Sequence, residues 1–365
     1  LIGAGVATVV ISFWLCTYYN VIISWAMFYL VSSFQNPLPW ISCDNWWNSD
    51  NCWDVHSNQS TMMSNSGGNI SSTQEFFDFR VLQMSSGIED FGSINLELLG
   101  FLVLAWIVVY FCIWKSVKTT GKVVLFTATF PYALLIAFVI RGCTLPGAWT
   151  GIKYFIEPQW EAMLDSKVWI YAAAQVFNSI GIAFGCLVAF SSYNPFHGRI
   201  LRDTLLVVVV DAVTCIICGL CVFSTMGNLA LEQNKDVDEV ISDGPGLVFV
   251  VFPHALSKMP IPQLWSVTFF FMLILLGIDS QVTKVFFKEL HCYLIKLFSF
   301  QFSTVEVIIT SLRDGFGDWI DRHIKHHEIL VLLVCLLGFA FGIPHIFKVL
   351  HFQRLPASKK DLSWT

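Results

Sequence analysis

The sequence has 365 residues, of which 21 are Lys or Arg, 26 are Asp or Glu, and 33 are Phe. Only 13% of the residues are charged and 55% are hydrophobic, against about 25% and about 45–50% in ordinary soluble domains. A soluble fold of this length needs more charge to cover its surface. The composition therefore excludes a cytosolic enzyme, a nucleic-acid binder and a disordered chain, and predicts an integral membrane protein.

Seven stretches are long and apolar enough for membrane-spanning helices, which need about 20 mostly apolar residues each. They are residues 1–33, 95–114, 123–140, 168–190, 204–226, 264–287 and 329–349. So many spans are more than a peripheral anchor needs, which indicates an all-α, multi-pass membrane protein. Because the first residue is Leu and already lies in an apolar run, we expect the chain to begin within a longer protein.

Positive charges mark alternate loops, and cytoplasmic loops are the ones enriched in Lys and Arg. One short loop holds Lys115, Lys118 and Lys122, whereas the loop at residues 43–94 holds one Arg and no Lys. We therefore place residues 43–94 outside the cell, and by the same alternation residues 229–262 as well.

The chemistry of the first outer loop agrees with this orientation. Cys43 and Cys52 are the cysteines of this polar stretch, and in an oxidising compartment they can close a small loop. Asn58 and Asn69 each begin a glycosylation sequon, which has a function only on the outer face. The alternative is a plain polar loop. Elsewhere, Cys215, Cys218 and Cys221 and the His-rich stretch 323–327 have spacings that suit a metal, but helix packing and a solvated helix start explain them more simply.

Two carboxylates lie inside apolar segments, Asp211 and Asp279. An ionisable group at membrane depth costs a few kcal/mol or more unless it is paired, so both are candidates for function. A hydroxyl and a glycine adjoin Asp279, which suits a small hard cation bound by oxygens. The alternative at each position is a structural hydrogen bond between helices.

The span at residues 168–190 has polar and small residues near its middle, namely Gln175, Asn178, Ser179, Gly181 and Gly185. They favour a broken helix whose exposed backbone groups bind ions or solutes at the bilayer midplane. Close packing of helices through small residues is the alternative.

Short strings spread along the chain match a known family. They are Tyr18-Tyr-Asn20, Leu38-Pro-Trp40, Lys118-Thr-Thr-Gly-Lys122, Phe126-Thr-Ala-Thr-Phe-Pro-Tyr132, Arg141-Gly-Cys-Thr-Leu-Pro-Gly147, Ser191-Ser-Tyr-Asn194, Gly244-Pro-Gly246 and Leu276-Gly-Ile-Asp-Ser280. Together they resemble the neurotransmitter:sodium symporter family, the sodium- and chloride-coupled carriers of GABA, amino acids and monoamines. The resemblance covers residues 1–344. It implies an incomplete LeuT-like transporter fold of about seven transmembrane helices, with a broken central helix, corresponding to the family's third to ninth spans.

The resemblance also implies roles for individual residues. It assigns substrate contacts to Tyr19, Phe177, Asn178, Gly181 and Ser280. It assigns one sodium site to Leu276, Asp279 and Ser280, and the other to Ser179 and Asp211. Chloride is assigned to Gln175 and Ser179, the cytoplasmic gate to Tyr193 and Asp314, and the outer-loop disulfide to Cys43 and Cys52.

The chain departs from the family pattern at several positions. Asp211 stands where an Asn is usual and Cys215 where a Ser is usual, and we hypothesise that the carboxylate weakens the need for chloride. Asn178 replaces an aromatic residue, which leaves the substrate class open. Residues 282–301 interrupt a continuous family segment, and we hypothesise a retained in-frame intron; the alternative is a real insertion that extends the span. Residues 345–365 form a tail unlike the family.

The resemblance implies sodium-coupled, chloride-assisted symport of a small amino acid or amine across the plasma membrane by alternating access. The implied partners are this substrate and the lipid bilayer, with sodium and chloride as co-transported ions and no nucleic acid or other cofactor. Two alternatives remain. One is a non-transporting, truncated membrane protein that lacks half of each ion site, and the other is an intramembrane enzyme, which would need a nucleophile–base pair at membrane depth that the sequence does not show.

Overall fold

The computed structural model describes residues 2–50, 52–54, 70–85, 93–113, 117–181, 184–185, 200–233, 236–240, 246–279, 300–324 and 326–347. In these ranges nearly all of the secondary structure is helical. The one sheet among them is a two-stranded parallel pair, β1 (Cys52–Trp53) with β2 (Ile70–Ser71).

Long helices coincide with the apolar stretches of the sequence. They are α1 (Ile2–Ser32), α4 (Leu96–Ile113), α5 (Val117–Cys143), α7 (Ser166–Ile180), α9 (Ile200–Gln233), α12 (Pro262–Asp279) and α15 (His327–Gly342), which is followed by the short helix η5 (Ile343–Ile346). A further helix, α14 (Phe300–His323), falls on none of the expected spans. By length and composition four helices of the described chain are able to cross a membrane, or five if the outer part of α5 is joined to α6 (Ala148–Ile156) across a bend of 112°.

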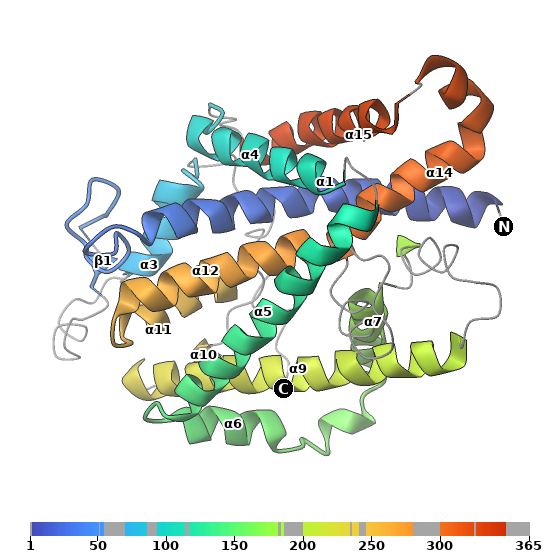
Figure 1. Ribbon diagram of the computed structural model, residues 1–365. Coiled ribbons are helices and arrows are strands. Elements are labelled where there is room, and N and C mark those ends of the chain that lie inside the picture. Colours follow the sequence, from blue (N-terminus) through green and yellow to red (C-terminus); the bar gives the residue numbers. More distant parts are fainter. Residues whose placement is uncertain are drawn as a thin grey trace.

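The helix α1 lies at the centre of one group of helices and packs against α4, α12, α14 and α15 (Figure 1). It is apolar on all sides, as is typical of a helix surrounded by others or by lipid. Toward the C-terminal end of α1, Trp25 and Tyr29 belong with Phe270 to a fully buried aromatic cluster. The hydroxyl of Tyr29 donates a hydrogen bond to the carbonyl of Phe249 at 2.7 Å, which ties α1 to the loop after α9.

That loop contains η4 (Leu247–Val251) and α11 (Phe252–Ser257). It packs beside the loop between α1 and α4, with its helices α3 (Ser72–Glu75) and η1 (Phe76–Val81). The Cys43–Cys52 disulfide is present, with the two Cα atoms 5.8 Å apart, which confirms that prediction. Glu75 is fully buried beneath it and accepts hydrogen bonds at 3.0 Å from the side chain of Asn48 and the backbone of Ser49. Asn58 and Asn69 lie outside the described residues.

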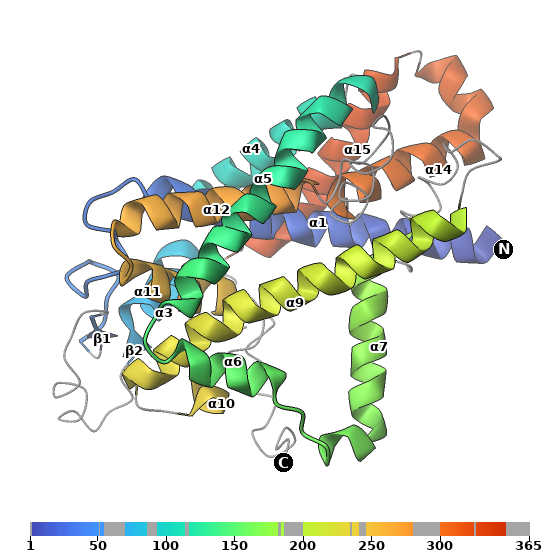
Figure 2. The ribbon, with the colours of Figure 1, turned by 60° about the horizontal axis from the view of Figure 1, so that its bottom comes forward.

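A second group consists of α6, α9 and the short α10 (Val237–Val240), and α7 touches α9 at its edge. The helix α6 runs antiparallel along the C-terminal end of α9 with backbone against backbone. A Cβ atom on Gly151 would lie 1.8 Å from the carbonyl oxygen of Phe223, so only glycine allows this approach. In contrast, α7 has no buried side chain, and Figure 2 shows it projecting from the side of α9.

Candidate ion and substrate site

The helix α7 ends where the small residues predict a break. Its N-terminus is capped by the carboxylate of Asp165, which accepts a hydrogen bond from the backbone N–H of Lys167. At the other end Gly181 has a φ of 72°, and its N–H donates to the carbonyls of Phe177 and Asn178. A left-handed glycine that satisfies the last carbonyls is a common helix stop. The span at residues 168–190 is therefore interrupted after Ile180.

The chain just beyond the break contacts α1. The hydroxyl of Ser12 donates a hydrogen bond to the carbonyl of Phe184 at 2.8 Å, and both residues are buried. Gly185, with a φ of 71°, lies so close to Thr8 that a Cβ atom would be 3.2 Å from its hydroxyl oxygen. The backbone groups freed by the break thus contact a helix that is distant in sequence. Non-helical backbone at membrane depth needs such partners within the protein.

Before the break, Ser179 and Asp211 meet. The hydroxyl of Ser179 donates a hydrogen bond of 2.7 Å to the carboxylate of Asp211, which joins α7 to α9. Asp211 is half-buried, and the described residues include no ion pair between it and a basic side chain. Among the described residues, its partner at membrane depth is therefore a hydroxyl donor rather than a basic side chain.

The surroundings of Asp211 add further polar groups. Cys215 lies one turn along α9, and its thiol also interacts with Ser179. Thr214 shares a hydrogen bond of 3.1 Å with the hydroxyl of Tyr132 on α5. Gln175, assigned to chloride by resemblance, lies one turn before Ser179 and is exposed.

The oxygen atoms of this cluster suit a hard cation such as sodium. A carboxylate and a hydroxyl are the ligand types that such cations prefer. No set of three His, Cys, Asp or Glu side chains in the described ranges converges on one point, so a transition-metal centre is not indicated there. The spacing of the cysteines on α9 is instead typical of residues along one face of a helix.

The other predicted residues lie on α1 and α12. Tyr19 contacts the backbone of Gly277, where a Cβ atom would be 3.7 Å from its ring. Leu276 is half-buried and lines an apolar cavity of about 180 Å³ between α5, α9 and α12. Asp279 is the last residue of α12. Its side chain and all of Ser280 lie outside the described residues.

The structure brings the predicted residues together as two separate sets. One comprises Tyr19 and Leu276, and the other comprises Ser179 and Asp211. Phe177 is 56% exposed and Asn178 is also exposed. The helix α7 packs sparsely, mainly against α9 and η2 (Ala162–Leu164).

Of the predicted cytoplasmic gate, Asp314 is exposed on α14, and Tyr193 lies outside the described residues. Three polar residues at the site were not anticipated from the sequence, namely Ser12, Tyr132 and Thr214. Each has one hydroxyl group and lies in a mostly apolar helix. The signal in the sequence was only that a polar group at membrane depth requires a partner.

Comparisons with known proteins agree on the family. A family model described as the sodium:neurotransmitter symporter family matches residues 1–349. The chain is 45% identical to the sodium- and chloride-dependent GABA transporter ine of Drosophila melanogaster over 96% of its length and 35% of that protein. It is 40% identical to the sodium- and chloride-dependent GABA transporter 2 of Rattus norvegicus, covering 93% of this chain and 53% of that protein. It is 39% identical to the creatine transporter of Torpedo marmorata, covering 57% of that protein.

A solved structure shows the same fold. The transporter MhsT in complex with L-phenylalanine matches 94% of this chain and 61% of its own, with a TM-score of 0.61 and 22% identity. The chain thus spans between a third and three-fifths of the proteins it matches. The family comprises multi-pass plasma-membrane transporters and not enzymes. With a LeuT-like fold and a family match over nearly all of its length, this chain belongs to the sodium:neurotransmitter symporter family.

Proposed function

We propose that this chain is part of a sodium-coupled symporter that carries a small amino acid or amine across the plasma membrane by alternating access. The observation that carries the proposal is the Ser179–Asp211 pair, which places oxygen atoms at the break of a membrane helix. The hydroxyl oxygen and the carboxylate oxygen are 2.7 Å apart. Helix breaks of this kind are where transporters of this class bind ions and substrate.

The pair supplies a physical basis for coupling. A sodium ion between Ser179 and Asp211 would neutralise the carboxylate and fix the end of α7 against α9. A second sodium ion is assigned to Leu276, Asp279 and Ser280. If one conformation of the protein binds both ions and the substrate better than the others, each ligand raises the affinity for the rest, and they move together.

Substrate binding requires the two sets of residues to come together. Tyr19 on α1 and the region of Phe177, Asn178 and Gly181 at the end of α7 would then face one another, with Ser280 beside them. The relatives named as GABA and creatine transporters support a substrate with a compact charged group. We propose a substrate of that size class for this protein.

Chloride is assigned to the neighbourhood of Gln175 and Ser179. Asp211 already supplies a fixed negative charge there, and Cys215 supplies a thiol instead of a hydroxyl. We therefore propose that chloride assists transport but that its contribution is smaller than in relatives with a neutral residue at the position of Asp211.

Radiotracer uptake tests the proposal. A longer protein that contains this chain and the remaining family spans is expressed in cells and supplied with labelled GABA, taurine, creatine and glycine, in sodium or in N-methylglucamine. We expect uptake of at least one substrate that depends on sodium. The variant D279N should lose it, while D165N, a helix cap outside the site, should not. Sodium-independent uptake, or loss in neither variant, would contradict the proposal.

A further inference from the structure

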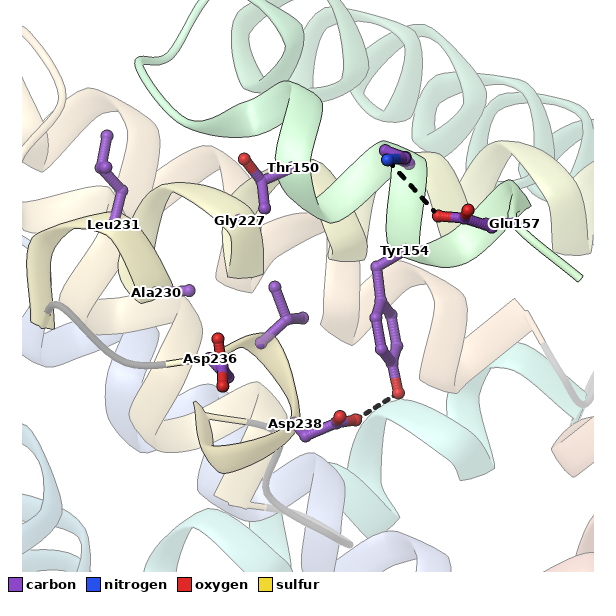
Figure 3. Close-up of a pocket in the computed structure, with 10 residues that line it drawn as sticks. Thr150, Tyr154, Glu157, Gly227, Ala230, Leu231, Asp236 and Asp238 are labelled. Carbon is purple, nitrogen blue, oxygen red and sulfur yellow. Dashed lines mark hydrogen bonds and ion pairs between the residues drawn. The ribbon is translucent and has the colours of Figure 1, made fainter. Parts of the chain in front are cut away.

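A cavity of about 570 Å³ lies at the outer end of α9, away from the ion site (Figure 3). One wall is a face of α6 that includes Thr150, Tyr154 and Glu157, spaced so that they point the same way. The outer turn of α9 with Ala230 lines it, and Asp236 and Asp238 form the opposite wall. Gly227 is 16 residues from Asp211 along α9, or about 24 Å at 1.5 Å per residue, so the two sites are distinct.

The walls of the cavity are held together on both sides. Gly227 contacts α6 so closely that a Cβ atom would be 2.5 Å from the backbone nitrogen of Gly151. Asn228 donates a hydrogen bond of 2.8 Å to the carbonyl of Pro146, at the turn that leads into α6. On the far side the hydroxyl of Tyr154 donates to the carboxylate of Asp238, which joins α6 to α10 (Figure 3). The cavity is thus built from three elements that are fixed to one another.

Among the described residues that line the cavity, the charges do not balance. Lys153 and Glu157 form an exposed ion pair of 3.7 Å along α6 and offset each other. Asp236 and Asp238 form no ion pair with a basic side chain of the described chain. The hydrogen bond to Asp238 raises the pKa of Tyr154, so its hydroxyl stays protonated and remains a donor at neutral pH.

We propose that this cavity binds a small organic ammonium ion from the extracellular side, with the ammonium between Asp236 and Asp238 and its short carbon chain against Ala230 and Leu231. The volume is within the range of small-molecule sites, about 300–1,000 Å³. An ammonium group donates several hydrogen bonds, and its positive charge balances the negative charge of the two carboxylates. Because the cavity lies away from the ion site, the bound amine occupies a place separate from that of the transported substrate.

Binding of n-butylammonium to the purified chain in detergent tests this inference, in potassium buffer without sodium. We expect saturable binding. The variant D236N should weaken the affinity about fivefold, as for a partly exposed charge pair, and D236N combined with D238N should abolish binding. The variant D165N removes an exposed carboxylate elsewhere and should bind normally. The variant T150W fills the cavity but keeps both carboxylates, and it should also abolish binding.

Three outcomes would overturn the proposal: n-butanol binding as tightly as the amine, unchanged affinity in D236N, or full binding by T150W. Melting temperatures of the variants show whether a loss comes from unfolding. Since neither sodium nor transport enters the measurement, failure here leaves the proposed symport untouched, and failure of symport leaves this site untouched.

Discussion

Asp211 carries a formal charge within an apolar helix, and its hydrogen bond to Ser179 positions the end of α7. The apolar context was visible in the sequence, and so was the need for a partner. Which hydroxyl would provide it was implied by the family resemblance, since nothing in the spacing of residues 179 and 211 pairs them. Ser12 and Phe184 show the opposite case: the chain around a helix break has no periodicity, so their contact could not be predicted.

Replacing Asp211 by Asn tests the role of its charge. In the longer protein with intact Asp211 we expect sodium-dependent uptake to survive complete replacement of chloride by gluconate, because the carboxylate supplies the local negative charge. In D211N the charge is gone, and uptake should become dependent on chloride. The measurement is the uptake rate against chloride concentration for both proteins.

The neighbouring variant C215S is the matched control, because it changes the same region and keeps the charge of Asp211. It should behave like the unchanged protein or gain a modest chloride response. If removal of chloride abolishes uptake even with Asp211 in place, the carboxylate does not substitute for the anion.

At the scale of the element, apolar stretches predicted the long helices well because burial in lipid and burial against other helices require the same residues. They missed α14, in which Arg313, Asp314, Asp318, Asp321 and Arg322 lower the hydropathy of the second half. They also missed α6, whose nine residues are held by contact with the backbone of α9 rather than by a long apolar run. Contacts between backbones leave no pattern except the glycines themselves.

The helices α12 and α14 have the features of a single interrupted helix. Both pack on α1, and Figure 1 shows α14 continuing past the end of α12. Gly277 of α12 and Thr304 of α14 are both buried, 27 positions apart, which places them about half a turn out of phase in one helix. Without the 20 residues of 282–301, Thr304 would follow Gly277 by seven positions, about two full turns.

We therefore predict that deletion of residues 282–301 joins α12 and α14 into one helix with a continuous buried face. The deletion variant should be at least as stable as the unchanged chain, with an equal or higher melting temperature and a single peak in size-exclusion chromatography. Deletion of 20 residues from within α9 is the control and should prevent folding. A deletion variant of 282–301 that aggregates would show that the segment is an integral part of the fold.

At the scale of the molecule, the two groups of helices are each internally packed, while α7 stands apart. The predicted substrate residues are accordingly divided, with Tyr19 in the first group and Asn178 on α7. The side chains of residues 166–178 of α7 are all exposed, which is unusual even for a membrane helix because Gln175 and Asn178 place polar groups where lipid would lie. The family fold could be predicted from the motif strings, but this separation could not, since it depends on which helices are neighbours.

If Tyr19 and Asn178 line one substrate site in the longer protein, they must approach each other when that site is occupied. Cysteines placed at both positions, in a background whose free thiols are replaced, should then be joined by a short bifunctional thiol reagent. Sodium and substrate together should raise the cross-linked fraction, because they favour the conformation in which the site is closed. A pair at positions 19 and 164 is the control, since Leu164 is the last residue of η2, before the start of α7, and should not react with position 19 under any condition. The absence of a 19–178 cross-link both with and without sodium would mean that α7 does not contribute to the substrate site, and the assignment of Phe177, Asn178 and Gly181 to substrate would be wrong.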